Sequence, residues 1–146
     1  MLFFKNEQIQ EVYRHGEETY PQECCGVLVG LFEDSKRLVQ KVYRTKNLNQ
    51  QRNDRYEMDL NDRLKIEAEA SKQGLSIVGF YHSHPDHEAY FSQTDLEGSE
   101  EYRWGEPWLP PTYAYLVVSV QEKKAKYYKA FLIQDGKAVE EKVSLQ

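Results

Sequence analysis

The hydrophobic residues near the start of the chain follow a helical spacing. Ile9, Val12 and Tyr13 recur at intervals of three and four residues, so they share one face of a helix. Asn6 stands where an N-terminal cap is expected. The pattern therefore predicts a helix over about residues 6–18.

A continuous apolar run follows over residues 24–32 and lacks the alternation of a half-exposed strand. Such a run is typical of a central strand that is buried on both faces. Residues 38–44 are expected to form its neighbour, because the polar residues 33–35 between them favour a turn. The polar stretch 47–54 is expected to be a loop.

A second helix is marked by its own boundary residues. Asp59 is a favourable N-terminal cap, and Gly74 is a favourable stop. Between them Leu60, Leu64 and Ala68 share one face, as in an amphipathic helix.

The rest of the chain alternates apolar strands with polar or irregular segments. The pair Asp135-Gly136 favours a type I′ turn, so the last two strands should form a hairpin. A third helix is expected to begin at Ser92, and residues 104–111 should form an irregular loop. The remaining strands are predicted over residues 56–58, 75–82, 113–120, 124–133 and 138–143. Together these elements predict a central sheet with helices packed against it, in a single domain over residues 1–146.

Composition places the chain among ordinary globular proteins and excludes several function classes. Hydrophobic residues make up 40% and charged residues 29%, which argues against disorder. The formal net charge of −5 argues against a nucleic-acid binder, which needs a basic surface. No apolar run is long enough for a signal peptide or a membrane span, so the cytoplasm is the expected compartment. The two cysteines, Cys24 and Cys25, are adjacent, which favours two reduced, buried side chains over a disulfide.

The residues that can carry chemistry gather in one segment. His82 and His84 stand two apart at the end of a predicted strand, so both imidazoles lie on the same face. Ser92 and Asp95 stand three apart at a helix start and also share a face. If this helix start faces the strand end, two imidazoles and one carboxylate converge.

Two histidines, one carboxylate and a position open to water make a typical catalytic zinc site, whereas structural sites are closed by four protein ligands. Zinc lowers the pKa of a bound water to about 7, but hydrolysis also needs a group that moves protons. Glu23, at the mouth of a buried strand, is a candidate, because a carboxylate there is costly unless it is paired or used.

The pattern resembles that of the JAMM (or MPN+) zinc metallopeptidase family: a distant Glu, then His-Ser/Thr-His-Pro, six residues, Ser, two residues and Asp. Its positions are filled here by Glu23, His82, Ser83, His84, Pro85, Ser92 and Asp95. Residues 21–30 and the pair Arg55-Tyr56 also resemble the small stand-alone bacterial members. The resemblance therefore covers nearly the whole chain.

The resemblance implies a role for each residue of the motif. His82, His84 and Asp95 would bind Zn²⁺, Glu23 would act as acid and base, and Ser92 would donate a hydrogen bond to the oxyanion. The implied fold is an α/β three-layer sandwich with a mixed central sheet, the JAB/MPN domain, which is similar to the cytidine deaminase arrangement.

The implied substrate is a ubiquitin-like sulfur-carrier protein, because members of the bacterial subgroup hydrolyse the bond after the Gly-Gly tail of such carriers. The identity of the carrier, the residues removed, the pathway and the oligomeric state do not follow from the sequence. A membrane partner is not expected.

Other interpretations stay open at this point. A non-catalytic scaffold of the same fold would bind protein partners, but such versions lack the histidines or the Glu. A DNA-repair-associated relative would carry Asn at the position of Ser83, and the acidic composition also argues against it. The residues Ser92 and Asp95 also match a helix capping box, which is compatible with a metal role. His87 is expected to be a solvated loop residue, and the aromatic pair Tyr90-Phe91 could line a groove or pack a loop.

Overall fold

The computed structural model describes residues 1–49, 51–100 and 112–146. The helices are α1 (Asn6–Thr19), α2 (Leu60–Lys72) and α3 (Gln93–Gly98). The strands are β1 (Leu2–Phe4), β2 (Cys25–Glu33), β3 (Lys36–Thr45), β4 (Ser76–Pro85), β5 (Ala114–Gln121), β6 (Lys124–Gln134), β7 (Lys137–Glu141) and β8 (Val143–Leu145). Within the described residues these strands form one mixed sheet in the order β7-β6-β5-β4-β2-β3-β1-β8.

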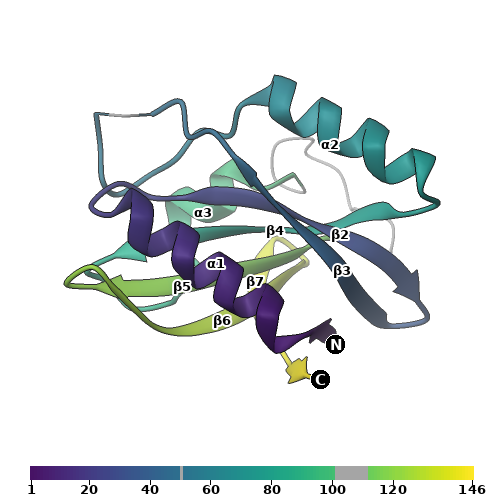
Figure 1. The fold of residues 1–146 in the computed structure, drawn as a ribbon. Coiled ribbons are helices and arrows are strands. Elements are labelled where there is room, and N and C mark those ends of the chain that lie inside the picture. The colour runs from purple at the N-terminus through teal and green to yellow at the C-terminus, as the bar shows by residue number, and fades with distance from the viewer. Residues whose placement is uncertain (50, 101–111) are drawn as a thin grey trace.

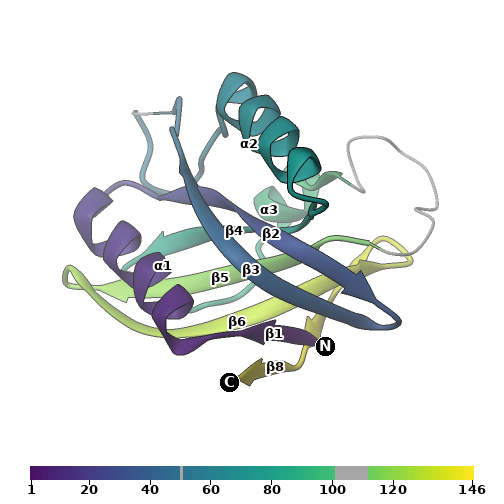
Figure 2. The ribbon, with the colours of Figure 1, turned by 45° about the vertical axis from the view of Figure 1, so that its right-hand side comes forward.

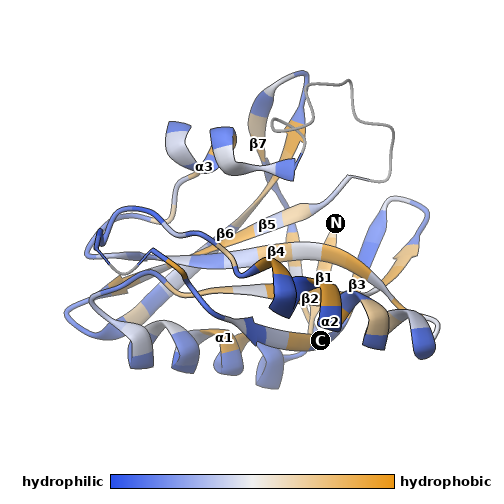
Figure 3. Cartoon of the chain, turned by 90° about the horizontal axis from the view of Figure 1, so that it is seen from above, coloured by the Kyte–Doolittle hydropathy of each residue, from blue (hydrophilic) through white to orange (hydrophobic). Residues whose placement is uncertain are grey.

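Helices α1 and α2 cover opposite faces of this sheet, which gives three layers (Figures 1 and 2). Ile9 and Val12 of α1 belong to the core cluster on one face, and Ile66 and Ala70 of α2 belong to the cluster on the other. Hydrophobic residues concentrate on the central strands, and hydrophilic residues follow the helices and turns (Figure 3). The predicted α/β sandwich with a mixed central sheet is therefore confirmed.

Strand β4 lies at the centre of the sheet, and this position matters most for the candidate site. It pairs antiparallel with β2, where Cys25 lies opposite His82, and parallel with β5, where Val117 lies opposite His82. Residues 25–30 of β2 are all buried, so the continuous apolar run correctly predicted a strand that is covered on both faces. Cys24 and Cys25 are buried and form no disulfide, as predicted.

The predicted cap of the first helix is wrong. Asn6 is the first helical residue, and the capping position with its extended backbone is Lys5. The Gln8 side chain reaches back and accepts a hydrogen bond from the backbone N–H of Lys5 at 2.8 Å. A side chain from the first turn thus satisfies a backbone donor that a cap at Asn6 would have left outside the helix.

The buried face of α2 also differs from the apolar face seen in the sequence. Leu60 and Leu64 are 62% and 54% exposed, whereas Ile66 and Ala70 are buried. The guanidinium of Arg63 lies over the ring of Phe80, 5.1 Å from its centroid, and Ile66 and Ala70 pack in the same core cluster as Phe80. Positions 63, 66 and 70 therefore face the sheet.

The boundaries of α2 are as predicted. The Asp59 carboxylate accepts a hydrogen bond from the backbone N–H of Asn61 at 2.8 Å, and Gly74 adopts a positive φ of 72° just after the helix. Glycine has no Cβ, so it adopts this conformation without steric cost.

The remaining strand predictions are confirmed with shifted ends and two exceptions. Residues 56–58 form no strand, since only an isolated bridge joins Asn47 to Met58. The final predicted strand divides into β7 and β8, and β8 pairs with β1, which the pattern did not predict. Asp135 and Gly136 both have positive φ, as a type I′ turn requires. The loop predicted over residues 104–111 lies outside the described residues.

None of the helices described is long and apolar enough to cross a bilayer.

Candidate metal centre

Three donor atoms from β4 and the first turn of α3 converge in the interior. The Nε2 atoms of His82 and His84 are 3.2 Å apart. Oδ2 of Asp95 lies 3.1 Å from the first and 3.0 Å from the second. A tetrahedral zinc ion with bonds of about 2.0–2.1 Å separates its ligand atoms by about 3.3 Å, so the spacing fits such an ion. All three residues are buried.

The local structure explains why these atoms meet. The pleat of β4 places His82 and His84 on the same face, as the spacing predicts. Ser92 caps α3: its Oγ accepts from the backbone N–H of Asp95 at 3.0 Å, and its own N–H donates to Asp95 Oδ2 at 3.0 Å. The capping box thus holds the carboxylate oxygen against the imidazoles. Asp95 Oδ2 can therefore serve both in the helix cap and as a metal ligand.

The hydrogen bond of His84 on its other side favours a cation in this cluster. Its Nδ1 lies 2.9 Å from the backbone carbonyl oxygen of Glu88. A carbonyl only accepts, so Nδ1 carries a proton, and Nε2 is the ring atom that faces Asp95. At 3.0 Å from the carboxylate oxygen of Asp95, this nitrogen must share either a proton or a metal ion with it. A backbone carbonyl that fixes the tautomer in this way is a common partner of metal-binding histidines.

Aromatic rings hold the imidazoles in place. Tyr56 stacks on His82, with centroids 4.8 Å apart and planes at 29°, and Tyr90 meets His84 edge-on at 5.0 Å. Phe91 lies 6.3 Å from His82. Apart from the family resemblance, the sequence pattern did not place Tyr56 at the site. The one further signal in the sequence was its position three residues before Asp59, the residue that caps α2.

The charges in the site oppose one another. Burial alone would raise the pKa of Asp95, but the neighbouring His82 and His84 outweigh it and hold that pKa well below its usual range. Asp95 is therefore a carboxylate in this setting, which is the form that binds a cation.

Glu23 lies just before β2 and is only 2% exposed. Its Oε1 has no hydrogen-bond partner among the described residues. Burial, followed by repulsion from Asp95 and Asp54, raises its pKa to about 9, and the positive charge of Arg55 acts in the opposite direction. Glu23 is therefore a buried carboxyl group that readily holds a proton and lies close enough to Asp95 for the two charges to repel each other.

A reciprocal contact ties the strand of Glu23 to the strand of the histidines. The Ser83 hydroxyl accepts from the backbone N–H of Cys24 at 2.8 Å, and the Ser83 N–H donates to the Cys24 carbonyl at 3.2 Å. Continuing this antiparallel register places Glu23 across from His84, on the same face of the sheet. The structure thus brings all five predicted site residues into one region, while their roles stay predictions.

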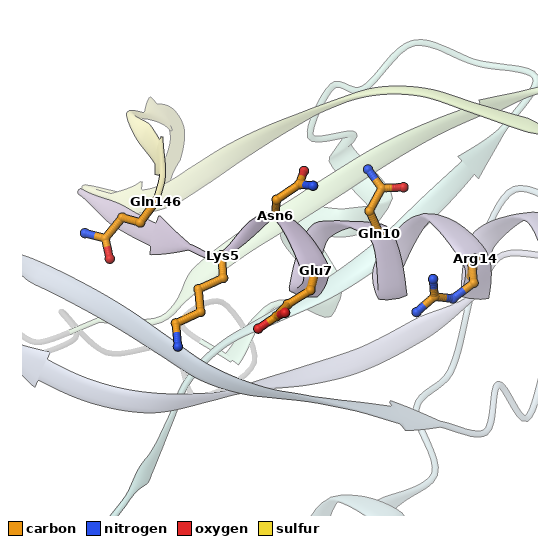
Figure 4. A pocket seen from close by; sticks show the side chains of 6 residues that line it. All are labelled: Lys5, Asn6, Glu7, Gln10, Arg14 and Gln146. Carbon is orange, nitrogen blue, oxygen red and sulfur yellow. The ribbon is translucent and has the colours of Figure 1, made fainter.

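A groove leads away from Asp95 along the sheet face that α2 covers. It is lined by residues of the segment before α2, of α2, of α3 and of the central strands, among them Arg55, Tyr56, Leu60, Phe80 and Tyr115. A second hollow, shown in Figure 4, is lined by Lys5, Asn6, Glu7, Gln10, Arg14 and Gln146 and contains none of the donor residues. It lies along α1, which covers the face of the sheet opposite to that covered by α2.

Residues 5–131 match the protein family described as prokaryotic homologs of the JAB domain. The chain is 28% identical over 146 residues to a CysO-cysteine peptidase of Mycobacterium tuberculosis, and this match covers 99% of this chain and 91% of that protein. It is 33% identical over 99 residues to a desampylase of Haloferax volcanii, which covers 68% of this chain and 63% of that protein.

Two solved structures share the fold over the full chain. A protein of Desulfitobacterium hafniense superposes with a TM-score of 0.81 at 29% identity, and the match covers 100% of this chain and 93% of that one. A protein of Salinibacter ruber superposes with a TM-score of 0.71 at 29% identity, with 100% and 92% covered.

We predict that His84→Ala or Asp95→Ala lowers the zinc retained after dialysis from about one ion per chain to near zero, because either change removes a donor. Inductively coupled plasma mass spectrometry gives the metal content directly. His87→Ala is the matched control, since His87 is exposed and outside the cluster, and it should retain the metal. Full occupancy in the Asp95→Ala protein would mean that the ligands lie elsewhere.

Proposed function

The chain belongs to the family of prokaryotic homologs of the JAB domain, and on that premise we propose that it is a zinc-dependent peptidase. Its proposed reaction is hydrolysis of the bond after the C-terminal Gly-Gly of a ubiquitin-like sulfur-carrier protein. The observation that carries the proposal is the convergence of His82, His84 and Asp95 beside the buried Glu23. The names of the two relatives, a CysO-cysteine peptidase and a desampylase, support a peptidase that acts on small protein tags or their adducts.

The three donors suit zinc by type, spacing and burial, and they leave a fourth tetrahedral position without a protein ligand among the described residues. Zinc held by them would act as a Lewis acid that activates water and polarises the scissile carbonyl at neutral pH. His82 and His84 would bind the ion through their Nε2 atoms, and the Asp95 carboxylate would contribute a negative charge to it.

Glu23 moves the proton in this proposal. Its carboxylate takes a proton from the attacking water and passes it to the nitrogen of the leaving group. The raised pKa, about 9, shows how well the buried carboxyl holds a proton once it has one. A cation held by the neighbouring cluster would favour the charged form of Glu23 and lower this pKa, which suits a group that both takes up and releases a proton.

Ser92 supplies a hydrogen-bond donor. Its Oγ accepts from the backbone N–H of Asp95, which uses a lone pair and leaves the hydroxyl proton available. That proton is directed to the oxyanion that forms on the scissile carbonyl. The same residue therefore fixes the start of α3 and contributes to the reaction.

We expect Glu23→Gln to keep its zinc and to lose turnover by roughly 10²–10⁴-fold, because glutamine has a similar shape and cannot move the proton. The assay is intact-mass spectrometry of a Gly-Gly sulfur carrier that bears a C-terminal cysteine or dipeptide. Glu7→Gln, the same exchange on the exposed surface of α1, is the control and should cleave normally. Undiminished cleavage by Glu23→Gln would remove Glu23 from the mechanism. A zinc-loaded unmutated protein that cleaves no such carrier would favour the scaffold interpretation.

Ser92→Ala should lower kcat by roughly 10²–10³-fold with little change in KM, because the donor acts on the oxyanion and not on the bound substrate. The same change removes a helix cap, so the free energy of unfolding should fall by about 1 kcal/mol. Ser92→Thr keeps the hydroxyl and should restore both quantities. Steady-state kinetics combined with urea denaturation separates the two effects. An alanine variant that loses only stability would leave Ser92 with the capping role alone.

A further inference from the structure

Three arginines lie near the groove, and two of them are neutralised by close partners. Arg52 donates two hydrogen bonds to Asp54, at 2.8 and 2.6 Å. Arg63 forms an ion pair with Glu100 and stacks on Phe80.

Arg55 differs from both neighbours. The nearest acidic atom to its Nε is Oδ1 of Asp54 at 3.8 Å, and that carboxylate is already occupied by Arg52. The Arg55 Nε is buried and has no hydrogen-bond partner in the described part of the chain. A buried donor without an acceptor is costly, so the arrangement suits a guanidinium that receives its acceptor from a ligand.

The position of Arg55 connects it to the reacting groups. It lines the groove that reaches Asp95, and the next residue, Tyr56, stacks on His82. Its positive charge also acts on Glu23, although burial is the larger influence there. The side chain is 43% exposed, so a ligand can reach it from the groove.

We propose that Arg55 binds the α-carboxylate of the residue that leaves when the bond after Gly-Gly is cut, which makes the protein selective for a single C-terminal residue with a free carboxylate. This inference rests on the proposed peptidase function and adds to it the chemistry of the leaving group.

Standard covalent geometry supports this assignment. In an α-amino acid the nitrogen and the carboxylate carbon are only about 2.5 Å apart across Cα. The group that protonates the leaving nitrogen and the group that holds the carboxylate must therefore be neighbours. Arg55 lies close enough to Glu23 for its positive charge to act on that carboxyl group, and a guanidinium can bind a carboxylate through two parallel hydrogen bonds of about 2.7–2.9 Å.

The proposal separates three kinds of substrate. A single added residue places its carboxylate next to the nitrogen that Glu23 protonates. A longer extension carries the carboxylate farther away, and an isopeptide bond to a lysine side chain offers no such group beside the nitrogen. Cleavage should therefore be fastest for the single residue.

The test uses the zinc-loaded, full-length protein and two carriers that end in Gly-Gly-Cys, one with a free carboxylate and one with a carboxamide. The unmutated protein should cleave the acid with a kcat/KM roughly 10- to 100-fold higher than that of the amide, as expected for a lost charge-assisted hydrogen bond. Arg55→Gln should bring this ratio close to one. Arg14→Gln removes the same charge on the exposed surface of α1, away from the groove, and should keep the preference.

A binding measurement gives a second readout that does not depend on turnover. In the Glu23→Gln background, isothermal titration calorimetry should show tighter binding of the acid than of the amide, and the additional Arg55→Gln change should abolish the difference. Equal handling of acid and amide by the unmutated protein would overturn the inference and leave the peptidase function intact. Equal losses on both substrates in Arg55→Gln would also overturn it, because Arg55 would then act through Glu23 or the carrier tail. Failure to cleave either carrier would instead overturn the proposed function itself.

Discussion

The close approach of three buried donor atoms is the constraint on which the rest of the site depends. Two imidazole nitrogens and a carboxylate oxygen lie 3.0–3.2 Å from one another in a region without solvent. The proton on His84 Nδ1 is committed to a backbone carbonyl, so the facing atoms are largely acceptors. Such an arrangement is unfavourable alone and favourable around a cation. The fold must therefore supply enough rigidity to hold these atoms together before the cation binds.

That rigidity comes from three sources at different levels of structure. The central place of β4 between β2 and β5 fixes the histidines from both sides. The capping box of α3 fixes the carboxylate, and the Tyr56 ring fixes His82. The reciprocal contact of Ser83 with Cys24 then places Glu23 on the same face. Each of these contacts also belongs to the fold, so the site is held by interactions that stabilise the whole domain.

The sequence predicted that His82, His84 and Asp95 converge because the relations that bring them together are local. A spacing of two on a strand and of three on a helix start determines which side chains share a face, and both relations hold at His84 and Asp95. The strand over residues 24–32 was predicted for a similar reason, since burial on both faces leaves a continuous apolar run.

Relations between distant segments could not be predicted in this way. The face of α2 that packs on the sheet depends on contacts with distant residues, such as that of Arg63 with Phe80. The spacing of Leu60 and Leu64 therefore predicted the wrong face, and both side chains are exposed. The short β1 exists only because β3 and β8 pair with it. The stack of Tyr56 on His82 and the unpartnered nitrogen of Arg55 likewise depend on how a loop folds over the sheet.

The most direct test of the account is zinc K-edge X-ray absorption on the zinc-loaded protein. It should show nitrogen and oxygen neighbours at about 2.0–2.1 Å, including two histidine rings. One of the oxygen neighbours should be a water that an inhibitor can replace. A sulfur neighbour at about 2.3 Å, which would implicate Cys24 or Cys25, would contradict it. A spectrum without histidine scattering would contradict it equally.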